Sequence, residues 1–477
     1  MSTGGDRRGA GRPVGRRGFL AAAGAALAPG VLGRGPRAFA GPLPSGPQER
    51  PTPSPSQLLW QRDELALFIH FGMNTFTDRE WGDGTEDPTL FAPSRLDAAQ
   101  WARVARESGF RAMVLTAKHH DGFCLWPTRT TDHSVAASPW RGGRGDLVGE
   151  FVDACRAEGL RVGLYCSPWD RHEPSYGDSP RYNDLYVRQL TELLGGYGPV
   201  HEVWFDGANG EGPNGRRQAY DWPRFWGIVR ELQPEAVIFS DAGPDVRWIG
   251  NERGVAGDPN WSTVDPTAVP VPGLAGEEVI RSLRHGDADG TVWRPGETDV
   301  SIRPGWFYHA AEDERVRSVD DLVELYFTSV GRNSKLLLNV PPTPEGLLHP
   351  TDALRLGRMR EALDRIFGDD LAVGAEPVWR ATGPRTAVAE LDLGRTVAVG
   401  VSDLREDVAR GQSVARWALE GSDGGSWRVL ARGTTIGYRK LDRVGPAPVR
   451  RVRLRVEEAV AAPLPVRIAL FAPEGGA

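Results

Sequence analysis

The stretch His201-Glu202-Val203-Trp204-Phe205-Asp206-Gly207-Ala208 decides how the rest of the chain is interpreted. Its centre, residues 203–205, is a short apolar run of β-branched and aromatic residues that ends on the carboxylate of Asp206. This pattern predicts a buried parallel strand that delivers Asp206 to its carboxyl end. Chemistry gathers at that end in sheets whose strands alternate with helices. An isolated aspartate there more often starts a turn, so the assignment depends on the other strands of the chain.

Apolar runs alternate with amphipathic segments on both sides of this stretch. Repeated strand–helix units predict a parallel sheet wrapped by helices, and we expect an α/β fold with a closed (β/α)8-like barrel over residues 58–370. No Gly-x-Gly-x-x-Gly follows the first strand, which argues against a dinucleotide-binding sheet. Besides the Asp206 stretch, the expected strands are 65–71, 111–118, 161–167, 236–241 and 335–340, and the expected helices are 94–108, 146–158, 182–194, 225–232 and 319–328.

Residues 254–298 are rich in Pro and Gly and show poor periodicity. The sixth and seventh strand–helix units therefore cannot be read from the sequence. We expect this segment to form long loops over the active face of the barrel.

From residue 371 to 477 the pattern changes to short alternating runs separated by turn signals such as Asp423-Gly424-Gly425. Such alternation predicts an all-β sandwich as a second, C-terminal domain. We expect it to support the barrel rather than to bind sugar, because no cluster of exposed aromatic residues is identifiable. The expected strands are 386–391, 396–401, 415–420, 427–431, 449–456 and 466–471.

The N-terminus has the three parts of an export signal in the right order. Arg16-Arg17 precedes an apolar run, residues 21–32, and Ala38-Phe39-Ala40 supplies a cleavage site. We expect residues 1–40 to be a twin-arginine signal, residues 41–57 a Pro/Ser-rich linker, and the mature protein to be extracellular or periplasmic. No membrane attachment is expected after cleavage. The three cysteines, an odd number, are expected to be buried free thiols.

A net charge of −6 gives no basic surface for nucleic acid. Polar side chains instead collect at the predicted strand ends: His70 on the first strand, Lys118-His119-His120-Asp121 after the second, Tyr165 on the third and Asp241 after the fifth. Because these ends share one rim of a barrel, we expect a common pocket.

Paired carboxylates are the chemistry that best fits this rim. Metal catalysis is disfavoured because no His-x-His on the first strand, Cys-x-x-Cys or His-Glu-x-x-His occurs, and no Gly-x-Ser-x-Gly marks a nucleophilic serine. Asp206 needs a partner that can carry a proton, and Glu252 follows a short Trp-containing run on the same rim. Glu80, Asp121, Asp241 and Glu297 are competing partners that spacing does not exclude.

Several segments occur together in a characteristic order: His70-Phe71-Gly72, Glu80-Trp81, residues 118–123, Tyr165, Val203 to Ala208 and Arg303-Pro304-Gly305-Trp306-Phe307-Tyr308. Over about residues 58–368, this combination resembles the α-L-fucosidases of glycoside hydrolase family 29. The resemblance implies a retaining mechanism with Asp206 as the nucleophile. It also implies that the fucose subsite is lined by His70, Glu80, Trp81, His119, His120, Tyr165, Trp204 and, by a weaker match, Trp306.

The resemblance also places the acid/base. The Trp-Phe-Asp-Gly-Ala-Asn-Gly segment, residues 204–210, is similar to the subgroup that prefers α-1,3/1,4-linked fucose on Lewis-type branched glycans, whose acid/base lies in Trp-x-Gly-Asn-Glu. That glutamate corresponds to Glu252. A retaining pair should lie about 5 Å apart. No cofactor and no metal are implied, and the expected partner is a fucosylated oligosaccharide or glycoconjugate.

Two other functions stay open at this point. The enzyme could tolerate many linkages, including α-1,2 and aryl fucosides, which would depend on residues 209–222 and 254–298. The barrel could also be a carbohydrate-binding protein without activity, although such a protein has no need of both carboxylates. The sequence gives no indication of the oligomeric state.

Overall fold

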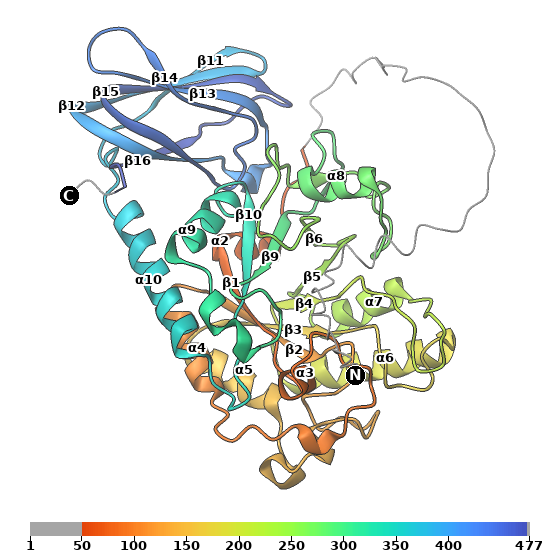
Figure 1. Ribbon diagram of the computed structural model, residues 1–477. Coiled ribbons are helices and arrows are strands. Elements are labelled where there is room, and N and C mark those ends of the chain that lie inside the picture. The colour runs from red at the N-terminus through yellow and green to blue at the C-terminus, as the bar shows by residue number, and fades with distance from the viewer. Residues whose placement is uncertain (1–49, 475–477) are drawn as a thin grey trace, which may run out of the picture.

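The apolar runs become the parallel strands of a closed barrel in the computed structural model, which describes residues 50–474 (Figure 1). The strands follow one another around the barrel in the order β1-β10-β9-β6-β5-β4-β3-β2, and every neighbouring pair is parallel. This confirms the barrel expected from the alternating pattern. The strands are β1 (Leu65–Ile69), β2 (Ala112–Lys118), β3 (Arg161–Cys166), β4 (Glu202–Trp204), β5 (Val237–Ser240), β6 (Val246–Trp248), β9 (Gly296–Ser301) and β10 (Ser334–Asn339).

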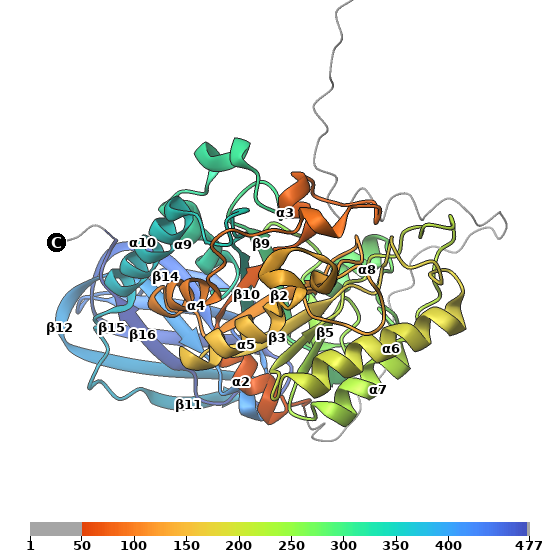
Figure 2. The same ribbon diagram turned by 90° about the horizontal axis from the view of Figure 1, so that it is seen from below.

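Helices surround these strands because the strands are apolar on both faces. All five residues of β1 and all seven of β2 are buried, so neither face can meet water. Helix α10 packs against α4 and α9, α4 against α5, and α6 against α7, as the view from below shows (Figure 2). The helices are α2 (Pro55–Asp63), α3 (Met73–Thr77), α4 (Ala98–Glu107), α5 (Leu147–Ala157), α6 (Ser179–Gly196), α7 (Trp222–Leu232), α8 (Glu277–His285), α9 (Val319–Thr328) and α10 (Pro350–Phe367).

The regular alternation breaks between β5 and β9. Only residues 241–245 separate β5 from β6, too few for a helix, and residues 249–295 hold α8 and a small hairpin of β7 (Thr263–Val264) and β8 (Val292–Trp293). The expectation that residues 254–298 lie over the active face is correct for only part of this segment. Gly273 N donates to Asp241 at the strand ends, whereas Ser262 N donates to Gln412 of the second domain.

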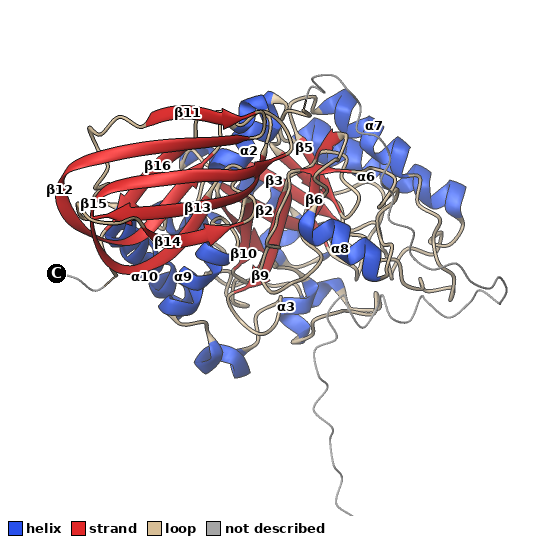
Figure 3. Ribbon diagram, turned by 90° about the horizontal axis from the view of Figure 1, so that it is seen from above, coloured by secondary structure: helices blue, strands red, loops and turns tan. Residues whose placement is uncertain are grey.

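The second domain is all-β, as expected, and its strands form an antiparallel sheet seen as a group of red arrows in Figure 3. The runs 386–391 and 396–401 are one strand, because the Asp392-Leu393-Gly394 signal produces a register shift rather than a chain reversal. The first strand was missed because its side chains are mostly exposed and show no buried alternation. The strands are β11 (Val378–Gly383), β12 (Thr386–Arg405), β13 (Val414–Ser422), β14 (Arg428–Gly433), β15 (Lys440–Ala459) and β16 (Arg467–Phe471).

The two domains share a buried interface. Phe471 of β16 packs its ring edge-on against Phe367 of α10, 5.2 Å between centroids. Arg439 is buried and donates to Glu64, at the start of β1, and to Asp403 of β12, at 2.7 and 2.9 Å. Asn333, just before β10, accepts from Tyr438 N at 2.8 Å. Apolar packing, ion pairs and amide contacts therefore fix the sheet domain to the barrel.

The predicted signal, residues 1–40, and most of the linker lie outside the described residues. Between residues 50 and 474, no helix has the length and apolar character needed to cross a membrane. Cys124, Cys155 and Cys166 are buried and free, as expected.

Candidate active site

A cavity of about 880 Å³ opens at the carboxyl ends of the barrel strands. All ten residues predicted for the site line it: His70, Glu80, Trp81, His119, His120, Tyr165, Trp204, Asp206, Glu252 and Trp306. They come from β3, β4 and the segments that follow β1, β2, β4, β6 and β9, so the closed barrel assembles them from distant parts of the chain. Every residue that lines the cavity lies between Phe68 and Arg315, in the barrel.

Asp206 is 7% exposed and receives a hydrogen bond on each carboxylate oxygen. Tyr165 OH donates to Oδ2 at 3.1 Å, and Ala208 N donates to Oδ1 at 2.8 Å. His120 Nε2 lies 4.0 Å from Oδ2. Because each oxygen of Asp206 receives a hydrogen bond from a donor, the contacts favour the ionised carboxylate, which is the form a nucleophile needs.

Three histidines form one wall of the cavity, and each has a partner on its far side. His70 Nδ1 contacts Asn339 Oδ1 at 2.8 Å, His119 Nδ1 contacts Asn74 Nδ2 at 3.3 Å, and His120 Nδ1 contacts Ser167 Oγ at 2.7 Å. The ring centroids of His70 and His119 are 5.6 Å apart, and those of His119 and His120 are 4.1 Å apart. Polar atoms on two of the barrel's strand ends are thereby held beside Asp206.

Glu80 lines the cavity and also holds its wall together. Its carboxylate accepts from Trp306 N at 2.9 Å, Phe307 N at 3.1 Å and His309 Nε2 at 2.8 Å. The hydrogen bond to Glu80, opposed by burial and aided by Asp78, raises the pKa of His309 to about 9. His309 is therefore a cation at neutral pH, and Glu80 anchors the loop that carries Trp306.

Trp204 forms part of the floor, although only 2% of its surface is exposed. Its ring stacks on Phe239 at 4.0 Å, and its Nε1 donates to Glu297 at 2.9 Å. Glu297 lies inside the barrel next to Glu202 and Lys335; burial and the charge of Glu202 raise its pKa well above the usual range. Glu297 does not line the cavity, so the geometry does not favour it as the partner of Asp206.

Two other competing carboxylates also lie off the cavity lining. Burial raises the pKa of Asp121 to about 7, and its Oδ1 accepts from Phe123 N at 2.8 Å. Asp241 Oδ2 accepts from Gly273 N at 3.1 Å. Asp121 and Asp241 each accept a hydrogen bond from a backbone N–H of a loop near the site, whereas Glu80 and Glu252 line the cavity.

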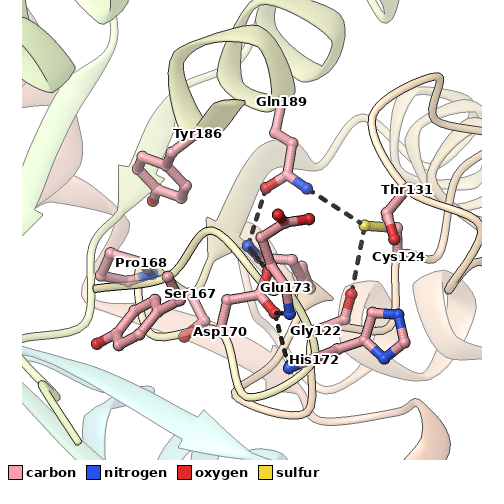
Figure 4. Close-up of polar contacts among 12 residues, drawn as sticks. Gly122, Cys124, Thr131, Ser167, Pro168, Asp170, His172, Glu173, Tyr186 and Gln189 are labelled. Atoms are coloured by element: carbon pink, nitrogen blue, oxygen red, sulfur yellow. Dashed lines mark hydrogen bonds and ion pairs between the residues drawn. The ribbon is translucent and has the colours of Figure 1, made fainter. Parts of the chain in front are cut away.

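A buried ion pair lies behind the paired histidines. Lys118, the last residue of β2, donates to Asp170 at 2.9 Å and to Gln189 at 2.8 Å, and both Lys118 and Asp170 are buried. Burial lowers the pKa of Lys118, but the charge of Asp170, the nearby Cys166 and Cys124, and the hydrogen bond to Asp170 together more than offset this, so the net shift is upward. Figure 4 shows Gln189 reaching from α6 toward Cys124 while Asp170 also accepts from the backbone of the residues after it. The pair therefore ties the end of β2 to the loop after β3.

Asp299, His309 and Arg315 are among the lining residues that sequence reasoning missed. Asp299 lies on β9, and the Pro- and Gly-rich segment before this strand conceals its alternating pattern in the sequence. Asp299 Oδ1 accepts a hydrogen bond from Trp248 Nε1 at 2.7 Å. His309 follows the quoted Arg303–Tyr308 motif by one residue, so the motif could have been extended to it. No local pattern distinguishes Arg315 from the other surface arginines. In the part of the chain that the structure describes, no three His, Cys, Asp or Glu side chains are grouped as a metal site.

Comparison with known proteins identifies the family. The α-L-fucosidase family profile matches residues 60–365. Alpha-L-fucosidase 1 of Arabidopsis thaliana is 41% identical over 450 residues, which cover 88% of this chain and 87% of the plant protein. Among solved structures, SpGH29 has a TM-score of 0.84 at 41% identity and covers 90% of this chain and 99% of its own.

A Ruminococcus gnavus GH29 fucosidase in complex with fucose has a TM-score of 0.80 at 30% identity, covering 91% of this chain and 97% of its own. Profile, sequence and structure agree over the whole barrel that carries the cavity. The chain belongs to the α-L-fucosidases of glycoside hydrolase family 29.

Proposed function

We propose that the protein is a retaining exo-α-L-fucosidase in which Asp206 is the nucleophile and Glu252 the acid/base. The observation that carries the proposal is that these two carboxylates line the same cavity as the eight side chains predicted to contact fucose. Tyr165 OH and Ala208 N hydrogen-bond Asp206, which favours its ionised form and fixes its orientation. Glu252 is half-buried at the cavity wall, so its carboxyl group is partly exposed to solvent and can reach the oxygen of the leaving group.

In the first step, a carboxylate oxygen of Asp206 bonds to the anomeric carbon while the glycosidic carbon–oxygen bond breaks. Glu252 gives its proton to the departing oxygen, so the defucosylated glycan leaves as an alcohol. In the second step, Glu252 takes a proton from water, the water oxygen bonds to the anomeric carbon, and the ester to Asp206 breaks. Two inversions at the same carbon give net retention.

The cavity suits a neutral deoxy sugar. Imidazole nitrogens can hydrogen-bond its hydroxyls, and Trp306, Trp81 and Phe68 offer ring surface to its methyl group and apolar face. One structural relative binds fucose, which supports the same ligand here. The volume of about 880 Å³ exceeds what one monosaccharide requires, so room remains for the sugars that carry the fucose.

We further propose that the preferred linkage is α-1,3 or α-1,4 on branched, Lewis-type glycans, and that the protein is exported by the twin-arginine route. The linkage rests on the segments 204–210 and 248–252, which border Asp206 and Glu252. Export rests on the order of the charged, apolar and Ala-x-Ala parts of residues 1–40.

The test is fucose release from Lewis a trisaccharide, 2'-fucosyllactose and an aryl α-L-fucoside. We expect release chiefly from the Lewis sugar, and we expect Asp206→Ala to lower kcat by about three orders of magnitude or more. Asp241→Ala is the matched control, because Asp241 follows the neighbouring strand but does not line the cavity. Equal release from all three substrates would contradict the linkage, and full activity in Asp206→Ala would contradict the nucleophile.

A further inference from the structure

Asn339 is a buried side chain that contacts two walls of the site without lining the cavity. It is the last residue of β10, pairs with β1 on one side and with β9 on the other, and is 0% exposed. Its Oδ1 lies 2.8 Å from His70 Nδ1, and its Nδ2 lies 2.8 Å from Trp306 O and 2.9 Å from Ser301 Oγ. One amide group therefore links His70 to the loop that carries Trp306.

The hydrogen-bond partners determine which way this amide points. Trp306 O is a carbonyl oxygen and can only accept, so the NH2 group of Asn339 must face it. Ser301 Oγ donates its own proton to Gly305 O at 2.7 Å, so it accepts from the same NH2 group. Oδ1 must then face His70, and because Oδ1 can only accept, His70 Nδ1 must carry the hydrogen.

The opposite nitrogen of His70 is the one left for a ligand. Burial lowers the pKa of His70 to about 4 against the opposing contributions of Asn339, Glu80 and Asp206, so the ring is neutral at pH 7. Within residues 50–474, His70 Nε2 has no hydrogen-bond partner in the protein, and His70 lines the cavity. A neutral ring with a hydrogen on Nδ1 has a lone pair on Nε2, which makes Nε2 an acceptor.

The neighbouring histidine has the opposite arrangement. His119 Nδ1 faces Asn74 Nδ2, and that NH2 group also donates to the carbonyl of Glu80, which fixes its orientation. Because His119 Nδ1 meets a donor, it accepts, and the ring hydrogen lies on Nε2. Two rings 5.6 Å apart thus differ in which nitrogen carries the hydrogen.

We propose that Asn339 is a positioning residue of the active site, which holds His70 in the form with hydrogen on Nδ1 so that Nε2 accepts a hydrogen bond from a hydroxyl group of the bound fucose. The same side chain fixes the backbone that carries Trp306, so the position of the Trp306 indole relative to His70 Nε2 stays constant. The identity of the ligand as fucose rests on the proposed function. The assignment of the hydrogen to Nδ1 of His70 is independent of that function.

Substitution of the amide by a carboxylate tests the acceptor toward His70, and it also removes the NH2 group that donates to Trp306 O and Ser301 Oγ, so a pH-dependent readout is needed to separate the two effects. Asn339→Asp keeps an acceptor for His70 Nδ1 but adds a negative charge, which stabilises imidazolium and raises the pKa of His70. Below that pKa, Nε2 carries a hydrogen and can no longer accept. The other titratable groups near His70 are unchanged in the variant; they are Glu80, His119, His120, Tyr165 and Asp206.

The decisive readout is the ring nitrogen spectrum of ¹⁵N-labelled protein, in which the His70 signal is assigned by its loss in His70→Gln. At pH 7 we expect hydrogen on Nδ1 of His70 and on Nε2 of His119. In Asn339→Asp we expect the His70 titration to move to higher pH. Hydrogen on Nε2 of wild-type His70, or an unmoved titration, would overturn the proposal. This readout needs no substrate, so it decides the state of the ring even if the protein releases no fucose.

The kinetic readout is the ratio of kcat/KM at pH 5 to that at pH 8. We expect Asn339→Asp to lower this ratio about tenfold relative to wild type, the effect of one misplaced buried hydrogen bond. Asn183→Asp is the matched control, since Asn183 is a buried asparagine on α6 whose amide donates to Ala219 O, and it should keep the wild-type ratio. A purely structural role for Asn339 would lower kcat/KM equally at both pH values, which would contradict the proposal.

Discussion

At the scale of single residues, Asp206 shows how much the sequence could establish. A strand-end aspartate is common, but the repeated strand–helix pattern placed it on a barrel rim, and the resemblance to a family then supplied its neighbours. All ten predicted residues line one cavity, because residues after successive parallel strands must meet at one end of a barrel. Asp299 could not be found in this way, since the irregular segment before β9 concealed the strand that carries it.

The proposed roles of Asp206 and Glu252 predict different products when each is replaced by alanine and azide is supplied as an external nucleophile. In Asp206→Ala, azide should attack the anomeric carbon directly and give β-L-fucosyl azide, because only one inversion takes place. In Glu252→Ala, azide should react with the fucosyl-Asp206 intermediate and give α-L-fucosyl azide. An aryl fucoside with a good leaving group is the substrate, and NMR of the product gives its configuration. The same configuration from both variants would contradict the assignment.

At the scale of elements, the carboxylate of Glu80 makes three of the hydrogen bonds that hold the loop 304–315 in place. Glu80 accepts from two backbone N–H groups of this loop and from His309, which also contacts Asp78 at 2.6 Å. Because the loop supplies Trp306, His309 and Arg315 to the cavity, its attachment bears on substrate binding.

The pKa of His309 predicts an alkaline limit for this attachment. The folded-state pKa is raised from 6.5 to about 9, so the ion pairs contribute fully below pH 6.5 and are lost as the pH rises through about 9. We expect KM to rise between pH 8 and pH 10 in the wild type. In His309→Gln the uncharged amide should remove this dependence, with a higher KM already at pH 7. A wild-type KM that stays constant to pH 10 would contradict a role for the His309 ion pairs in holding this loop for substrate binding.

The elements with a clear period were the predictable ones. Helix α9, residues Val319–Thr328, begins and ends at the predicted positions because Ser318 caps it and its apolar stripe is unbroken. By contrast, β6 has three residues and follows β5 without a helix, so no period exists to be read. β11 was missed for a related reason, since a strand without a buried face leaves no alternation in the sequence.

At the scale of the whole molecule, the sheet domain and the barrel form one unit. The apolar core of the barrel continues into Val401, Leu441 and Phe471 of the second domain. Asn260 and Gln412 add amide contacts across the boundary, with Gln412 Nε2 donating to Asn260 O at 3.1 Å. Sequence patterns identified both domains but not this interface, because contacts between distant residues leave no local signal.

Two glycines of the second domain provide a matched test of the interface. Gly437 and Gly445 both have positive φ, +65° and +66°, so alanine is strained at either position. A Cβ at Gly437 would meet the side chain of Asn333 in the barrel, whereas one at Gly445 would meet open space. We expect Gly437→Ala to lower the free energy of unfolding by about 1–3 kcal/mol more than Gly445→Ala, measured by chemical denaturation. Equal losses would show that the contact with Asn333 is unimportant.

The hydrogen bond between His70 and Asn339 joins residues 269 positions apart in the sequence. During synthesis, β1 and its histidine leave the ribosome long before β10 exists to close the barrel beside it. A nascent chain that stops short of Asn339 has every predicted catalytic residue and still lacks the strand that orients the first histidine. Fucosidase activity should therefore appear only after β10, the last barrel strand in the sequence, has been translated, and its appearance reports that the barrel has closed.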